Sequence, residues 1–106
     1  MAERGITLLD DNRECAVQFS AAPHNRVLLK IGQTWEDCDK RSAGRRLKIL
    51  KLYEGRDARK RPQVYADCEV IFDGLPNRQG VALGRVVHIK VERFRPTASG
   101  YRLIED

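Results

Sequence analysis

Residues 32–46 read Gly-Gln-Thr-Trp-Glu-Asp-Cys-Asp-Lys-Arg-Ser-Ala-Gly-Arg-Arg, and the rest of the chain is organised around them. They contain the only Trp of the sequence, Trp35, and a sharp change from acidic to basic side chains. They lead into an apolar run at residues 47–53, which alternates with polar residues and then changes phase at Leu50. This change of phase predicts a strand with a bulge or a strong bend. The strands that follow are expected to return to Trp35 and enclose it.

The clearest strand pattern lies at residues 64–72, where apolar and polar side chains alternate along the whole segment. This period of two is typical of a strand with one face in the core and the other in water. Five side chains are expected to point inward: Val64, Ala66, Cys68, Val70 and Phe72. Residues 87–91 and 101–104 predict two further strands, and in the second of these Tyr101 and Leu103 are expected to point inward.

Segment 54–63 follows the bent strand and contains Gly55 and Pro62, which interrupt a strand pattern. It is expected to form an exposed basic loop whose tip is residues 59–61. Pro96 likewise interrupts the chain and predicts a short helical turn before the last strand.

The N-terminal residues 1–30 favour a hairpin, although a helix also fits their pattern. Asp-Asp-Asn at residues 10–12 separates two alternations of apolar and polar residues, which is typical of two strands joined by a turn. The helical alternative depends on Thr7 and Asp10, which resemble a capping box, and on apolar residues that also share a helical face. Residues 27–31 then alternate again on the way to residue 32.

A chain of 106 residues is typical of one domain with one hydrophobic core. No apolar stretch approaches the length of about 18 residues that a membrane span needs. The N-terminus carries acids where a signal peptide would have a basic flank, which predicts a cytoplasmic protein. Cys15, Cys38 and Cys68 are widely spaced and odd in number, so reduced thiols are expected, and neither a disulfide framework nor a zinc site.

The positive charge is concentrated in one segment of the chain. Residues 40–61 contain ten Lys or Arg residues against only Glu54 and Asp57, whereas the whole chain has a net charge of +5. A basic strand with its adjoining loop is expected to form a positive surface that nucleic acid or a protein partner could contact, although basic loops are also common on solvated surfaces. The candidate contact residues are Arg45, Arg46, Lys48, Arg59, Lys60 and Arg61.

The acids at 36, 37 and 39 form the second candidate surface. Neighbouring carboxylates can serve catalysis or metal binding, but no suitably placed His joins Glu36, Asp37 and Asp39, and bases follow at once. A salt-bridged, solvated loop is the expected arrangement. The Ser and Cys residues also lack a nucleophile motif. We therefore expect no catalytic residues, no metal, no cofactor and no enzyme activity.

The order of the predicted strands, with a bend in the second and a single turn before the last, resembles an SH3-like barrel. The sequence also carries Gly32-Gln33-x-Trp35-x-Asp37-x-Asp39-x-Arg41-Ser42-x-Gly44-Arg45 and, near its end, Arg93-Phe94-Arg95-Pro96-Thr97-x-x-Gly100-Tyr101-Arg102-Leu103. Together these motifs resemble a family of small uncharacterised proteins from actinobacteria and their phages. The resemblance covers residues 31–106 and implies a phage or prophage origin.

The fold expected from the sequence is mainly β, with an SH3-like five-stranded barrel at residues 31–106 and a hairpin or helix at residues 1–30. The expected function is that of a small phage-type accessory protein in the cytoplasm of the host, which docks its basic face on nucleic acid or on a host complex that handles nucleic acid. The alternative is an inhibitor of a host or antiviral-defence enzyme, with the acidic residues 36–39 or the N-terminal segment as its contact surface.

Overall fold

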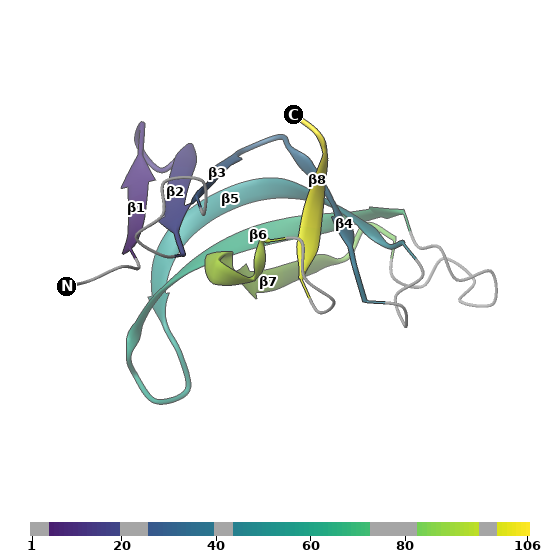
Figure 1. Cartoon of the computed structure of the whole chain (residues 1–106). Coiled ribbons are helices and arrows are strands. Elements are labelled where there is room, and N and C mark those ends of the chain that lie inside the picture. The colour runs from purple at the N-terminus through teal and green to yellow at the C-terminus, as the bar shows by residue number, and fades with distance from the viewer. Residues whose placement is uncertain (1–4, 20–25, 40–43, 73–82, 96–99) are drawn as a thin grey trace.

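The computed structural model of the chain describes residues 5–19, 26–39, 44–72, 83–95 and 100–106. These residues form two antiparallel sheets and one short 3-10 helix (Figure 1). The strands are β1 (Gly5–Leu9), β2 (Glu14–Gln18), β3 (Arg26–Lys30), β4 (Thr34–Asp37), β5 (Arg46–Arg56), β6 (Pro62–Phe72), β7 (Val86–Lys90) and β8 (Tyr101–Glu105), and the 3-10 helix is η3 (Val91–Arg93). The prediction of a mainly β fold is confirmed.

The first sheet has the strand order β1-β2-β3 and the second has the order β7-β6-β5-β4-β8. Strand β4 therefore lies between β5 and the last strand, β8, which returns to it from the far end of the chain. Strands β7 and β8 form the two edges of the larger sheet, so its described strands do not close on themselves.

The long hairpin of β5 and β6 carries the predicted bulge. The register shifts between Ile49 and Lys51, which leaves Leu50 without a partner on β6. The predicted loop at 54–63 is wrong, because pairing continues to Arg56 and Pro62, and only residues 57–61 connect the strands. Pro62 is compatible with a strand because it occupies the first position of β6.

Strand β6 faces the core over most of its length. Ala66, Cys68 and Val70 are buried and Val64 packs against the core, as expected. Phe72 differs from the prediction, because its side chain is 46% exposed. It lies beyond the end of the core.

The C-terminal block supplies aromatic side chains to the centre of the core. Trp35 is buried and its ring meets Phe94 edge to face at 5.2 Å, while Phe94 stacks on Tyr101 at the same centroid distance. The predicted helical turn exists as η3, slightly earlier in the chain than expected. The prediction that Leu103 points inward is wrong, because its side chain is exposed beside an open groove.

The N-terminal segment is a hairpin and not a helix. Strands β1 and β2 pair in antiparallel fashion, and Asp10, Asp11 and Asn12 form the turn with φ values of 50°, 54° and 67°. Asp and Asn tolerate this left-handed region better than most residues. Strand β3 adds to β2, and the buried residues Cys15, Val17 and Leu29 join the same hydrophobic cluster as Trp35. The small sheet thus shares one core with the large one.

The three cysteines are free thiols. Burial raises the pKa of Cys15 to about 11 and that of Cys68 to about 12, so both behave as small apolar core residues. Among the described residues, no helix has the length and the apolar character that crossing a membrane requires.

Candidate nucleic-acid interface

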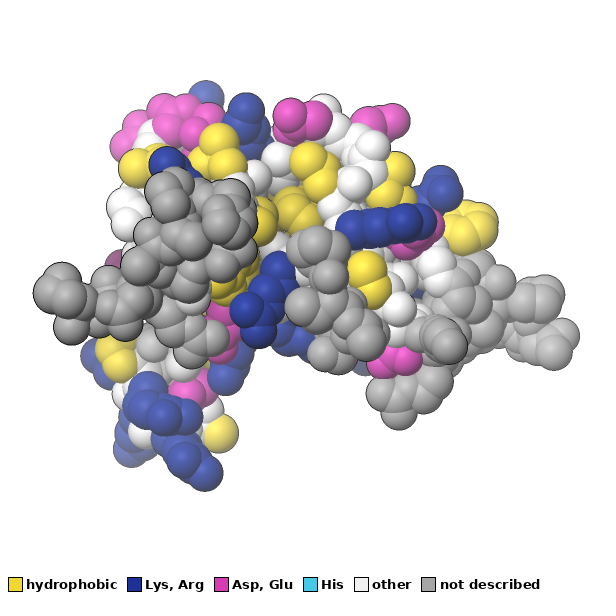
Figure 2. All heavy atoms as spheres, in the orientation of Figure 1, with side chains coloured by type: hydrophobic (Ala, Val, Ile, Leu, Met, Phe, Trp, Pro, Cys, Tyr) yellow, Lys and Arg dark blue, Asp and Glu magenta, His cyan; other side chains and the backbone are white. Residues whose placement is uncertain are grey.

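The six basic residues singled out in the sequence fall into two groups at opposite ends of β5. Arg45, Arg46 and Lys48 lie at the start of the strand, whereas residues 59–61 lie at the tip of the hairpin. A strand of 11 residues spans roughly 33 Å at its usual rise, so the two groups do not form one continuous patch. Figure 2 shows dark blue side chains gathered at the hairpin end, which projects away from the body of the molecule in Figure 1.

Two of the three bases at the start of β5 are engaged by acids of β4. Arg45 pairs with Asp37 at 3.3 Å, and Arg46 pairs with Glu36 at 3.5 Å. Arg102 from β8 also donates to Glu36, at 2.9 Å from its Nε. The Arg102 hydrogen bond is the largest cause that holds the pKa of Glu36 below its ordinary value of 4.5. Two acids therefore pair with three arginines here, and part of the positive charge is balanced.

The same contacts account for the acidic edge. Glu36 and Asp37 belong to strand β4 and not to a solvated loop, and Asp37 is buried. Its Oδ1 accepts the backbone N–H of Asp39 at 2.9 Å. The salt-bridged arrangement that the sequence predicted is present for Glu36 and Asp37, and it ties β4 to both of its neighbours. The carboxylates of these two acids are therefore already used in contacts within the protein.

The hairpin tip is built around Asp57. Its Oδ1 accepts the backbone N–H groups of Arg59 and Arg61, both at 2.9 Å, and its Oδ2 accepts from the Arg61 and Gln63 side chains at 3.3 Å. The backbone hydrogen bond from Arg61 is the largest cause of a lowered Asp57 pKa. The negative charge of Asp57 is thus directed into the turn.

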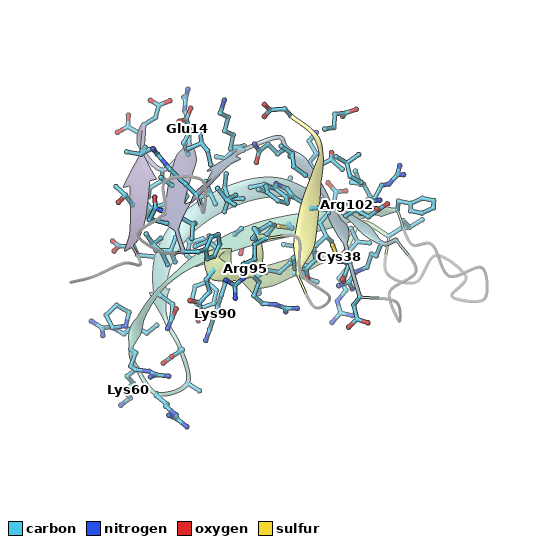
Figure 3. All side chains as sticks on the ribbon, in the orientation of Figure 1. Glu14, Cys38, Lys60, Lys90, Arg95 and Arg102 are labelled. Carbon is cyan, nitrogen blue, oxygen red and sulfur yellow. The ribbon has the colours of Figure 1, made fainter. Side chains whose placement is uncertain are left out.

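The bases of the tip are presented outward by this turn. Arg56 donates to the carbonyl of Lys60 at 2.9 Å, and Lys60 takes a left-handed φ of 63°. The side chain of Arg61 is 63% exposed even though it contacts Asp57. Figure 3 shows Lys60 at the end of the hairpin, far from Arg102. The tip therefore carries four bases and one acid, and the carboxylate of that acid already accepts hydrogen bonds from the turn.

An aromatic pair on the outer face of the same hairpin was missed at the sequence level. Tyr53 and Tyr65 lie opposite each other in the register and stack at a centroid distance of 5.9 Å. Lys51 places its Nζ 5.3 Å from the Tyr53 ring, and Lys90 is the β7 partner of Tyr65. A Cβ on Gly55 would lie 3.2 Å from the Tyr65 ring, so the small residue leaves room for it. Only the cross-strand register reveals this pair.

The ring of Tyr53 is oriented by a hydrogen bond from its hydroxyl to the neighbouring strand. Its hydroxyl donates to Asp67 Oδ1 at 2.8 Å, and His88 Nδ1 contacts the same oxygen. Partial burial, followed by the hydrogen bond to Asp67, raises the pKa of Tyr53 to about 12. Lys51 is the β5 partner of Asp67 in the register. The arrangement holds an aromatic surface in place beside basic side chains.

Among the described residues, no group of three His, Cys, Asp or Glu side chains is placed to hold a metal ion. No family model, no curated protein and no solved structure matches this chain. The resemblance to the actinobacterial and phage family stays a prediction that depends on the quoted motifs. Several motif residues in the described ranges stabilise the fold. Trp35, Phe94 and Tyr101 are part of the core, and Asp37 pairs with Arg45.

Proposed function

We propose that the protein is a small phage-type accessory protein of the host cytoplasm that docks the β5–β6 hairpin on nucleic acid. The observation that carries this proposal is the hairpin tip, where Arg56, Arg59, Lys60 and Arg61 surround one acid that the turn itself uses. Phosphate contacts from clustered Lys and Arg supply most of the affinity in sequence-independent binding. The stacked pair Tyr53 and Tyr65 adds a surface on which bases can stack.

The proposed scaffold is a partly open SH3-like barrel formed by residues 31–106. Three features support it: the strand order β7-β6-β5-β4-β8, the bulge in β5 after Ile49, and the 3-10 turn that separates β7 from β8. In this scaffold the β5–β6 hairpin extends beyond the barrel and carries the binding residues.

The alternative is a protein inhibitor that uses Glu36, Asp37 and Asp39 as its contact edge. It is less well supported, because Glu36 and Asp37 already pair with Arg102, Arg46 and Arg45. A partner that sought these acids would have to displace three arginines.

The test measures binding to a single strand of about 20 nucleotides and to its duplex over a range of salt concentrations. If the tip contacts about three phosphates, log affinity falls against log salt with a slope of roughly −2 to −3. The variant with Arg59, Lys60 and Arg61 replaced by Ala should fold normally and lose most of this slope.

The matched control removes Arg46 and Lys48 at the other end of β5. It should leave the salt slope unchanged, because those residues lie at the end of β5 opposite the tip. A triple tip variant with unaltered affinity and slope would contradict the proposal. Tyr65→Ala should weaken binding of the single strand by about 1–3 kcal/mol and binding of the duplex by less, since only unpaired bases can stack on the ring.

A further inference from the structure

An apolar groove of about 450 Å³ lies between strands β3 and β8, away from the basic hairpin. Val27, Leu28 and Leu103 line it together with Trp35. Leu28 and Leu103 are 37% and 43% exposed, so their side chains are only partly covered. In Figure 2 hydrophobic side chains come to the surface between these two strands, and Figure 1 shows that β8 runs to the C-terminal end.

Both strands that border the groove are edges of their sheets. Among the described strands, β3 pairs only with β2, and β8 pairs only with β4. An edge strand presents backbone N–H and C=O groups on which a further strand can form a ladder. The groove therefore combines an apolar floor with the edges of two sheets.

The side chain of Gln33 shows which backbone groups of β3 face the groove. Its Oε1 accepts the backbone N–H of Lys30 at 2.9 Å, and its Nε2 donates to the carbonyl of Leu28 at 3.3 Å. The side-chain amide thus occupies this edge as the backbone amide of an added strand would. In an antiparallel strand the N–H and C=O of one residue point to the same side, so the N–H of Leu28 also faces this edge.

The rim of the groove is mainly basic. Arg26, Lys30 and Arg102 line it, and the acid among the lining residues is Asp106. Asp106 accepts a hydrogen bond from Gln33 at 3.0 Å, and Arg102 is shared with Glu36. Arg26 and Lys30 stand on the outer face of β3, where an incoming strand would bring its own side chains. The charge favours an acidic occupant.

We propose that this groove binds an extended acidic segment of a partner protein, which adds as a strand along the edge of β8, because the Gln33 amide already bonds to the edge of β3. Alternate apolar side chains of the segment would cover Leu28 and Leu103, and its acids would meet Arg26 and Lys30. The binding site is separate from the nucleic-acid surface of the β5–β6 hairpin. The protein would then connect a protein partner to the nucleic acid that the hairpin contacts.

The test uses a synthetic peptide of about eight residues that alternates valine and glutamate, titrated into the full chain. Trp35 is the only Trp, lines the groove and bonds to Gln33 at 3.0 Å, so its fluorescence reports occupancy. Saturable binding is expected. A peptide with lysine in place of glutamate, and one with proline at its centre, should each bind at least about tenfold more weakly, because they lose the charge match or a ladder donor.

Two neighbouring residues of β8 give a matched pair of variants. Leu103 and Ile104 are 43% and 41% exposed, but of these two only Leu103 lines the groove. Leu103→Asp should weaken the glutamate peptide by about tenfold or more, whereas Ile104→Asp should change its affinity less than about twofold. Equal binding by both variants would overturn the proposal.

Arg26→Glu provides a second variant at an exposed position in case Leu103→Asp fails to fold. It should remove most of the preference for the glutamate peptide over the lysine peptide, because two bases would then face two acids at the rim. An unchanged preference would overturn the charge argument. Self-association of the chain that Leu103→Asp abolishes, without any binding of the peptide, would assign the groove to a second copy and overturn the proposal as well. Oligonucleotide binding by these variants should be unchanged, which separates this inference from the function of the hairpin.

Discussion

Gln33 shows how one buried polar side chain can fix several elements at once. Its amide bonds to the backbone of Lys30 and Leu28 on β3, to the indole N–H of Trp35 and to Asp106 at the end of the chain. Both its donor and its acceptor are used, so the buried amide does not carry the cost of unsatisfied polar groups. The residue before it, Gly32, takes a φ of 97°, which few other residues adopt readily. These two residues set the path of the chain from the small sheet to the large one.

The ion pairs of Glu36 should make the stability of the protein depend on pH. Because Arg102 and Arg46 lower its pKa in the folded state, the unfolded chain binds the proton first as the pH falls. The stability that Glu36 contributes is present above its unfolded pKa of 4.5 and is lost as the pH falls through its lowered folded value. Glu36→Gln should lower the free energy of unfolding by on the order of 1 kcal/mol near neutral pH and by less in acid, since exposed pairs are weak.

Urea denaturation at several pH values measures this difference. Glu54→Gln, at an exposed position of β5, serves as the control and should follow the wild-type pH profile. A difference between Glu36→Gln and the wild type that stays constant into acid would show that the carboxylate charge does not matter.

At the scale of the element, the β5–β6 hairpin combines two roles along its length. Near its open end Leu47, Ile49, Cys68 and Val70 are buried, whereas Tyr53 and Tyr65 lie on its outer face. The bulge at Leu50 changes which side chains of β5 face inward, so that Leu52 is buried after it. A strand that changes phase can contribute to the core and still extend a free tip into water.

Strand β6 predicts a large contrast between adjacent positions. Val70 is 1% exposed and Ile71 is 42% exposed. Val70→Asp should unfold the protein or cost more than about 3 kcal/mol, because it buries a carboxylate without a partner. Ile71→Asp should cost less than about 1 kcal/mol, because its side chain reaches water. Thermal melts of the two variants test this prediction. Similar melting temperatures would mean that Val70 and Ile71 do not lie on opposite faces of β6.

At the scale of the whole molecule, the two sheets meet in one hydrophobic cluster. Cys15 and Leu29 of the small sheet are fully buried in the cluster that contains Trp35, and Arg95 lies 4.9 Å from the ring of Phe19. The boundary between residues 1–30 and 31–106 remains a prediction from the sequence. A shared core suggests that the two parts unfold together, and this can be measured.

Leu29→Ala tests whether the sheets are coupled. Removing a fully buried Leu side chain typically costs about 2–5 kcal/mol, and the loss should appear equally in Trp35 fluorescence and in far-ultraviolet circular dichroism. Leu28→Ala, at a position that is 37% exposed, should cost less than about 1 kcal/mol. Two separate transitions in the Leu29→Ala variant would instead indicate that residues 31–106 fold as an independent unit.

The features of the fold that depend on local periodicity could be predicted from the sequence. Alternation at residues 64–72 identified β6, the change of phase at Leu50 identified the bulge, and Asp-Asp-Asn favoured the N-terminal hairpin. It also placed Trp35 in the core, because a single large aromatic residue in a small domain has few other places to be buried. These features follow from residues that are close together in the chain.

The tertiary structure alone decided which surfaces are open and which charges are balanced. Phe72 and Leu103 have the periodicity of buried residues, yet their side chains are 46% and 43% exposed. Arg102 is 66 residues from Glu36 in the chain, and Tyr53 meets Tyr65 only through the strand register. The physical reason is that burial and pairing depend on what lies opposite a side chain in space, and a period of two specifies only the face to which that side chain points.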